Sequence, residues 1–104
     1  MSLQMMIMNL ISGIRDPTTR IDIASTIHYL FDIYAGGHAN EGDIRNSIFD
    51  ICRDVLRFKF PDLTEDEIRE KAGEMTEEFM RVFRLESARR RVMSRIRPRF
   101  GLTV

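Results

Sequence analysis

The chain has 104 residues, of which 43% are apolar, and its formal net charge is zero. A chain of this length forms one domain at most, so we expect a single domain over residues 1–104 with a modest hydrophobic core. The lone cysteine, Cys52, excludes an internal disulfide bond and is typical of a reducing compartment. No segment approaches the roughly 18–20 apolar residues that span a bilayer, and the first residues lack the basic region of a secretion signal. These features predict a cytoplasmic protein that does not enter a membrane.

The spacing of apolar residues is helical throughout the chain, and the first predicted helix covers residues 3–14. Its apolar residues surround nearly the whole helix: Leu3, Met5, Ile7, Met8, Leu10, Ile11 and Ile14. Such a helix is either wholly buried or leaves an apolar stripe exposed for a partner.

The second predicted helix covers residues 17–35, and the third covers residues 41–59. Asp16 and Asn40 are suited to cap them, Pro17 suits a first helical position, and Gly36–Gly37 ends the second helix. The face of the second helix that we expect to point inward consists of Ile21, Ala24, Ile27, His28, Phe31 and Tyr34. The third helix has a broad apolar arc, which predicts contact with two neighbours. This arc consists of Ile44, Ile48, Phe49, Ile51, Cys52, Val55, Leu56, Phe58 and Phe60.

The fourth predicted helix begins at a capping box formed by Thr64 and Glu67, and no proline interrupts it before Pro98. Apolar residues follow alternating steps of four and three, as in a coiled-coil seam: Ile68, Ala72, Met75, Phe79 and Val82. A helix over residues 64–97 would be about 50 Å long, whereas the second and third helices would span about 30 Å. These elements predict an all-α fold, a small antiparallel bundle of about four helices whose long C-terminal helix projects beyond it.

The seam of the fourth helix is interrupted by two charges before it resumes. The same steps lead to Glu86 and Arg89, and apolar residues return at Met93 and Ile96. This interruption predicts that packing within the chain ends near Glu86 and that contact with a partner begins there. The predicted interface consists of Met75, Phe79, Val82, Glu86, Met93 and Ile96.

The end of the chain is strongly basic, although the total charge is zero. Residues 81–104, which we call the arm, contain one acid and eight arginines, so the arm carries +7 and the rest of the chain −7. The arginines are Arg81, Arg84, Arg89, Arg90, Arg91, Arg95, Arg97 and Arg99. Arginine suits phosphates and carboxylates, so this segment is predicted to bind an anionic or protein partner.

Residues 68–82 superficially resemble the helix-turn-helix of bacterial repressors, with Gly73 at the turn. The pattern departs from that motif at Arg69, where a small residue is usual, and at Glu74, where an apolar one is usual. The second helix of such a motif contacts the bases, and acidic residues on it would also repel the phosphates. We therefore favour a glycine inside one long helix.

No residue pattern predicts catalysis, a cofactor or a metal. Neither His28 nor His38 follows a glutamate by three residues, as the ligand pairs of a di-iron bundle require. His28 is expected to be a buried or half-buried ring, and Cys52 a small core residue without a neighbouring base. An enzyme is therefore not expected, and neither is a cofactor.

Two function classes remain open. The first is a non-catalytic interaction protein, either an accessory subunit or a self-associating bundle, that docks through its long last helix and its apolar first helix. Its partner would be a second copy of the chain or a larger protein. The alternative is a nucleic-acid-binding protein whose arm holds phosphates. The arm favours the first class for two reasons. Its apolar residues need a partner surface: Leu85, Val92, Met93 and Ile96. Apart from Phe83 and Phe100, it has no aromatic residues to stack on bases.

Overall fold

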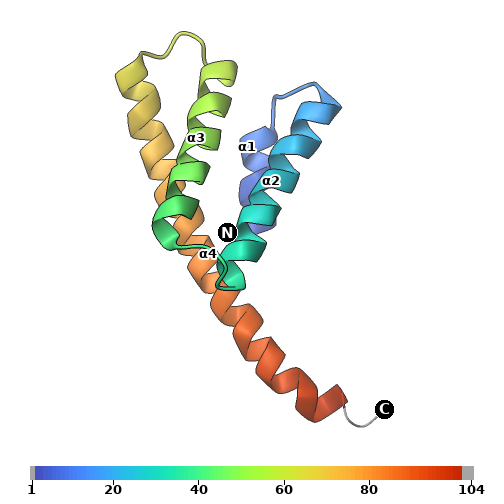
Figure 1. Ribbon diagram of the computed structural model, residues 1–104. Coiled ribbons are helices and arrows are strands. Elements are labelled where there is room, and N and C mark those ends of the chain that lie inside the picture. The colour runs from blue at the N-terminus through green and yellow to red at the C-terminus, as the bar shows by residue number, and fades with distance from the viewer. Residues whose placement is uncertain (1, 102–104) are drawn as a thin grey trace.

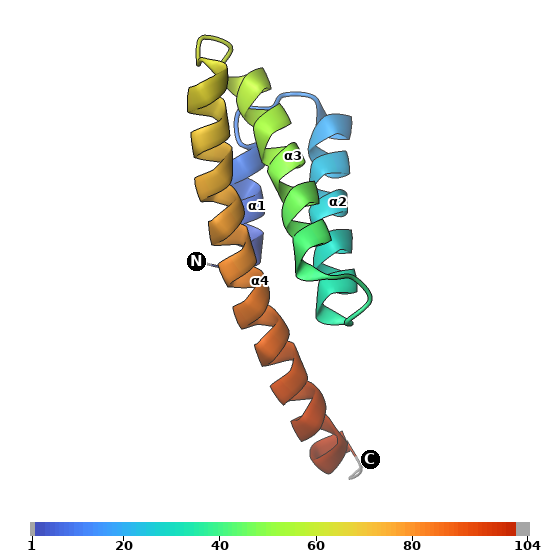
Figure 2. The same cartoon turned by 60° about the vertical axis from the view of Figure 1, so that its left-hand side comes forward.

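The computed structural model describes the backbone of residues 2–101 and the side chains of residues 2–95. The fold over these residues is all-α, as predicted, with α1 at Leu3–Ile11, α2 at Pro17–Ala35, α3 at Glu41–Lys59 and α4 at Glu65–Gly101. Successive helices run in opposite directions, so that α1 with α2 and α3 with α4 form two helical hairpins (Figure 1). Figure 2 shows that α4 continues well past the ends of the other three helices.

Local capping determines where the helices begin. The Asp16 carboxylate accepts the Thr19 backbone N–H at 3.1 Å, and the Asn40 side chain accepts the Asp43 backbone N–H at 2.8 Å. The capping box of α4 is reciprocal: Thr64 Oγ1 accepts the backbone N–H of Glu67, and the Glu67 carboxylate accepts that of Thr64. Each bond satisfies an amide that has no partner inside its own helix.

The first helix is shorter than predicted because the chain turns at Gly13. The φ angle of Gly13 is +87°, which a residue with a side chain rarely adopts, and this ends the helix after Ile11. Ile14 nevertheless stays buried, since its backbone N–H bonds to the Ile11 carbonyl and returns the side chain to the core.

All four helices contribute to one hydrophobic cluster. Its largest fully buried side chains are Phe79 and Phe83 of α4, and Phe83 packs edge-on against Phe31 of α2 with ring centroids 5.2 Å apart. The expected seam residues Ile68 and Ala72 are also buried. The whole cluster consists of Leu3, Ile7, Leu10, Ile11, Ile14, Ile27, Leu30, Phe31, Ile44, Ile48, Cys52, Val55, Leu56, Ile68, Ala72, Phe79, Met80, Val82 and Phe83.

Four positions that were predicted to face neighbouring helices are exposed. Ile21 is 64% exposed, Phe58 is 69% exposed and Phe60 is 47% exposed, and His28 also lies at the surface. The buried face of α2 is narrow because only Ile27, Leu30 and Phe31 reach the core fully. The ring of His28 therefore faces outward, contrary to the expectation of a buried histidine.

Helix α4 runs without a break through Gly73, which excludes a helix-turn-helix there. Its 37 residues correspond to about 55 Å at 1.5 Å per residue. The molecule measures 58 × 29 × 22 Å, and its radius of gyration of 16.0 Å exceeds the roughly 13 Å of a compact domain of this size. The projection of α4 that the sequence predicted accounts for this elongated shape.

Candidate interaction surface

Two long-range contacts hold the first part of the arm against the bundle. The Arg84 guanidinium lies 2.9 Å from the Glu41 carboxylate at the start of α3, and the Tyr34 hydroxyl also donates to Glu41 at 3.4 Å. The bond from Arg84 lowers the pKa of Glu41, while burial, followed by the nearby Glu41 charge, raises the pKa of Tyr34. This cluster joins α2, α3 and α4 at one end of the bundle.

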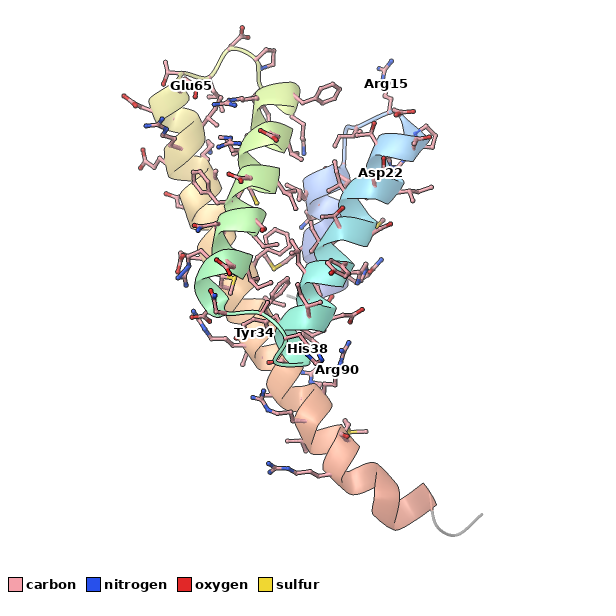
Figure 3. The ribbon with its side chains drawn as sticks, viewed as in Figure 1. Arg15, Asp22, Tyr34, His38, Glu65 and Arg90 are labelled. Carbon is pink, nitrogen blue, oxygen red and sulfur yellow. The ribbon has the colours of Figure 1, made fainter. Side chains whose placement is uncertain are left out.

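The second contact lies six residues further along α4. The Arg90 guanidinium stacks 4.7 Å from the centroid of the Phe31 ring and lies 3.3 Å from the Asp32 carboxylate. Figure 3 shows Arg90 close to the end of α2, beside Tyr34 and His38. Burial along α4 ends in the same region, since Ser87 is 2% exposed and every side chain from Ala88 to Arg95 is exposed. The predicted end of packing near Glu86 is therefore confirmed by this burial.

The arginines of the arm do not form one basic patch. Four of them pair within the chain: Arg81 with Glu78, Arg84 with Glu41, Arg89 with Glu86, and Arg90 with Asp32. Arg91 and Arg95 form no ion pair with any residue in the described part of the chain. The side chains of Arg97 and Arg99 lie outside the described residues. Within that part, the unpaired positive charge of the arm is concentrated at Arg91 and Arg95.

The predicted interface residues divide into core and surface. Val82 is 1% exposed and packs inside its own chain, so it does not offer a surface to a partner. Phe79 is also 1% exposed and contributes only to the wall of the groove described below. Met75 and Glu86 are half-buried, and Met93 is 51% exposed. The side chain of Ile96 lies outside the described residues. Leu85 and Val92, at 58% and 52% exposure, belong with Met93, and together these three side chains form the exposed apolar stripe of the arm.

An apolar groove of about 450 Å³ lies beside the other half of α4. Leu10 of α1, Leu56 of α3 and Phe79 of α4 contribute to its lining, and Glu74 and Glu78 bring negative charge to it. A smaller hollow of about 270 Å³ shares Phe60, Met75 and further lining residues with it and extends along α4 to Lys71. The sequence did not reveal this groove, because its walls come from three helices that only the fold brings together.

Among the described residues, reactivity at Cys52 and metal binding both depend on the environments of the side chains concerned. Cys52 is fully buried, and burial raises the pKa of its thiol to about 12, so the thiolate needed for nucleophilic attack is scarce near neutral pH. Among the described residues, no group of three or more His, Cys, Asp or Glu side chains is arranged to hold a metal ion. No helix in the described part of the chain is both long and apolar enough to cross a membrane.

No protein-family model matches the chain, and neither the curated proteins nor the solved structures include a significant match.

Proposed function

We propose that this protein is a non-catalytic helical interaction protein that docks through the exposed part of α4. The observation that carries this proposal is the stripe of Leu85, Val92 and Met93 on a helix that extends past its last contact with the bundle. A projecting helix gains no stability from packing on its own domain, and exposed apolar side chains favour a partner surface. Leu85 and Val92 are seven residues apart, which is one of the spacings that helix-in-groove docking uses.

The first helix supplies a second apolar surface. Met5 and Met8 of α1 are 56% and 50% exposed and lie three residues apart on its outer side. Methionine adapts its shape to different partners, so such a pair suits a docking surface better than a fixed catalytic cleft. The outer side of α1 is therefore proposed as an accessory part of the interaction surface.

The proposal is tested by site-specific photocrosslinking in the native cell. A photoreactive residue in place of Val92 should form an adduct with a protein, either a second copy of the chain or another subunit. The same residue in place of Asp22, an exposed position of α2, is the control and should form none. If position 92 yields no protein adduct, or yields nucleic-acid adducts only, the proposed function is wrong.

A second candidate function, nucleic-acid binding, is favoured by one observation. Arg91 and Arg95 are exposed and form no ion pair in the described part of the chain, so both are free to neutralise phosphates. Two cations on one exposed helix face provide contacts to a backbone but no reading of base edges. Binding of this kind would be indifferent to sequence and strongly dependent on salt.

A further inference from the structure

The charges of α4 are divided along its length. Its first half, residues 65–78, contains seven acids and two basic residues and so carries −5. Residues 81–99 contain eight arginines and one glutamate and carry +7. Two such helices placed side by side in parallel would bring like charges together, whereas an antiparallel pair would bring the acidic half of each beside the basic half of the other.

The groove and the apolar stripe lie on the same side of α4. Met93 follows Met75 by 18 residues, and Val92 follows Glu74 by the same interval, which equals five full turns at 3.6 residues per turn. Met75 and Glu74 line the groove, whereas Val92 and Met93 are exposed at the other end. A second α4 lying antiparallel on this side would therefore bring its apolar stripe to the groove, and the reverse contact would form at the same time.

The lengths of the two surfaces also match. The hollows beside α4 extend from Phe79 to Lys71, which is about 12 Å of helix at 1.5 Å per residue. The apolar stripe from Leu85 to Met93 covers the same number of residues and so the same length. The groove and the apolar stripe therefore have the same length along α4.

The unpaired charges have matching spacings as well. Glu70 and Glu74 are exposed, four residues apart, and form no ion pair with a described residue. Arg91 and Arg95 are also exposed, four residues apart and without an ion pair in that region. In an antiparallel arrangement, the register that places Arg91 opposite Glu74 also places Arg95 opposite Glu70. At about 100° per residue, Arg91 and Arg95 lie about 100° and about 60° from Val92, both on the side away from Met93, so their side chains flank the apolar contact.

We propose, on the basis of the docking function above, that the partner is a second copy of this chain. The two α4 helices lie antiparallel, and each arm places Leu85, Val92 and Met93 over the other protomer's groove. Arg91 and Arg95 of each chain pair with Glu74 and Glu70 of the other. A two-fold axis near residues 82–83 relates the two chains, so the contact is closed and forms a dimer, not a filament.

The test is a charge exchange between the two surfaces. The arm variant carries Arg91→Glu and Arg95→Glu, and the groove variant carries Glu70→Arg and Glu74→Arg. Each variant alone turns four attractive pairs of the dimer into like-charge contacts, so its self-association should weaken about a hundredfold. The wild type should have the mass of two 12.2 kDa chains at micromolar concentration, and each variant alone should have the mass of one. A mixture of the two variants should form the heterodimer, because both of its contacts are again between opposite charges.

Asp22→Arg is the matched control, because it reverses an exposed charge of α2 away from α4, and it should leave the dimer intact. Circular dichroism of every variant verifies that the helices remain folded. A folded wild type that stays monomeric overturns the dimer, while the crosslinking at position 92 still decides the docking function. A dimer that the arm variant breaks and the groove variant leaves intact overturns the groove as the site and leaves docking through the arm standing. A dimer that neither variant weakens, or a mixture that remains monomeric, overturns the proposed pairing.

Discussion

The guanidinium of Arg90 lies 4.7 Å from the centroid of the Phe31 ring, across 59 residues of sequence. The contact is made at the end of α2, where α4 leaves the bundle, and the Asp32 carboxylate completes it at 3.3 Å. Beyond Arg90, no described side chain of α4 makes a ring contact or an ion pair with another helix. Arg90 therefore marks the boundary between the anchored and projecting parts of α4.

Replacing Arg90 with alanine should lower the free energy of unfolding by about 0.5–1 kcal/mol, because an exposed cation–π contact has about that strength. The exposed ion pair with Asp32 adds little in water. Urea denaturation followed by circular dichroism measures the change. Arg91→Ala is the control, since it removes the neighbouring arginine without a described ion pair. Equal stability of the two variants would show that the contact with Phe31 does not anchor α4.

Replacing Phe83 with alanine should lower the free energy of unfolding by about 3–5 kcal/mol. The side chain is 0% exposed, and its ring contacts those of Phe31, Tyr34 and Phe79. Its loss therefore leaves a cavity between α2 and α4. Denaturant midpoints provide the measurement, and Leu85→Ala, two residues away at an exposed position, should change stability far less. A small effect at Phe83 would contradict its place at the centre of the core.

Much of this fold follows from local sequence signals. The bounds predicted for α2 and α3 agree with the structure, because Asp16, Asn40 and Gly36–Gly37 act within a few residues of each helix end. The projection of α4 was also predictable, since helix length follows from the absence of proline and the absence of a break at Gly73.

The choice of the buried face was less predictable. Helix α4 carries several apolar stripes, and periodicity alone does not reveal that Met80 and Phe83 become core residues. Phe83 is covered by Phe31 and Tyr34 of α2. Conversely, Ile21 and Phe58 were placed inward by their spacing, but no neighbouring helix covers either of them fully. The pairs Arg84–Glu41 and Arg90–Asp32 connect residues 43 and 58 positions apart, so no local pattern could predict them.

Alkylation of Cys52 should be slow in the native state. With its pKa raised to about 12 by burial, the thiol stays protonated and covered at pH 8, and iodoacetamide should react only through unfolding. Mass spectrometry of the labelled chain with and without urea measures the difference. The pKa of the Cys52 thiol is higher in the folded chain than in the unfolded chain. Its contribution to the free energy of unfolding is therefore fully present below the unfolded pKa of about 8.5 and is lost as the pH rises toward 12. Rapid labelling without urea would contradict the burial of this residue.

The capping box of α4 should make the free energy of unfolding depend on pH in the acidic range. Hydrogen bonds from the backbone and then the side chain of Thr64 lower the pKa of Glu67, so its contribution is present above the unfolded glutamate pKa of about 4.3 and is lost as pH falls through the lower folded value. The melting temperature should therefore fall less on acidification for Glu67→Gln than for the wild type, because the glutamine amide does not titrate there. Thr64→Ala should cost about 1 kcal/mol at neutral pH through loss of the cap. Parallel pH profiles of the wild type and Glu67→Gln would show that the carboxylate bond is not formed.

Salt separates the two functions proposed for the arm. If Arg91 and Arg95 grip phosphates, the logarithm of nucleic-acid affinity should fall with the logarithm of salt concentration, with a slope of about −0.9 for each phosphate neutralised. The Arg91→Glu, Arg95→Glu variant should then lose this binding to both duplex and single strands. We expect instead that the wild type binds nucleic acid only weakly, because Arg84 and Arg90 already pair with Glu41 and Asp32.

Under the interaction function, self-association should also weaken as salt rises, since the screening length falls from about 10 Å at 0.1 M to about 3 Å at 1 M. The apolar contacts of Leu85, Val92 and Met93 do not depend on charge, so association should be reduced at high salt without being abolished. Removing residues 91–104 should abolish it and leave thermal unfolding nearly unchanged, because the truncation retains Arg90 and all the buried residues of the core. Two results together would refute docking through α4 and establish the arm as a phosphate-binding segment. The first is tight, salt-dependent nucleic-acid binding that disappears with the charge reversal, and the second is a monomeric wild type.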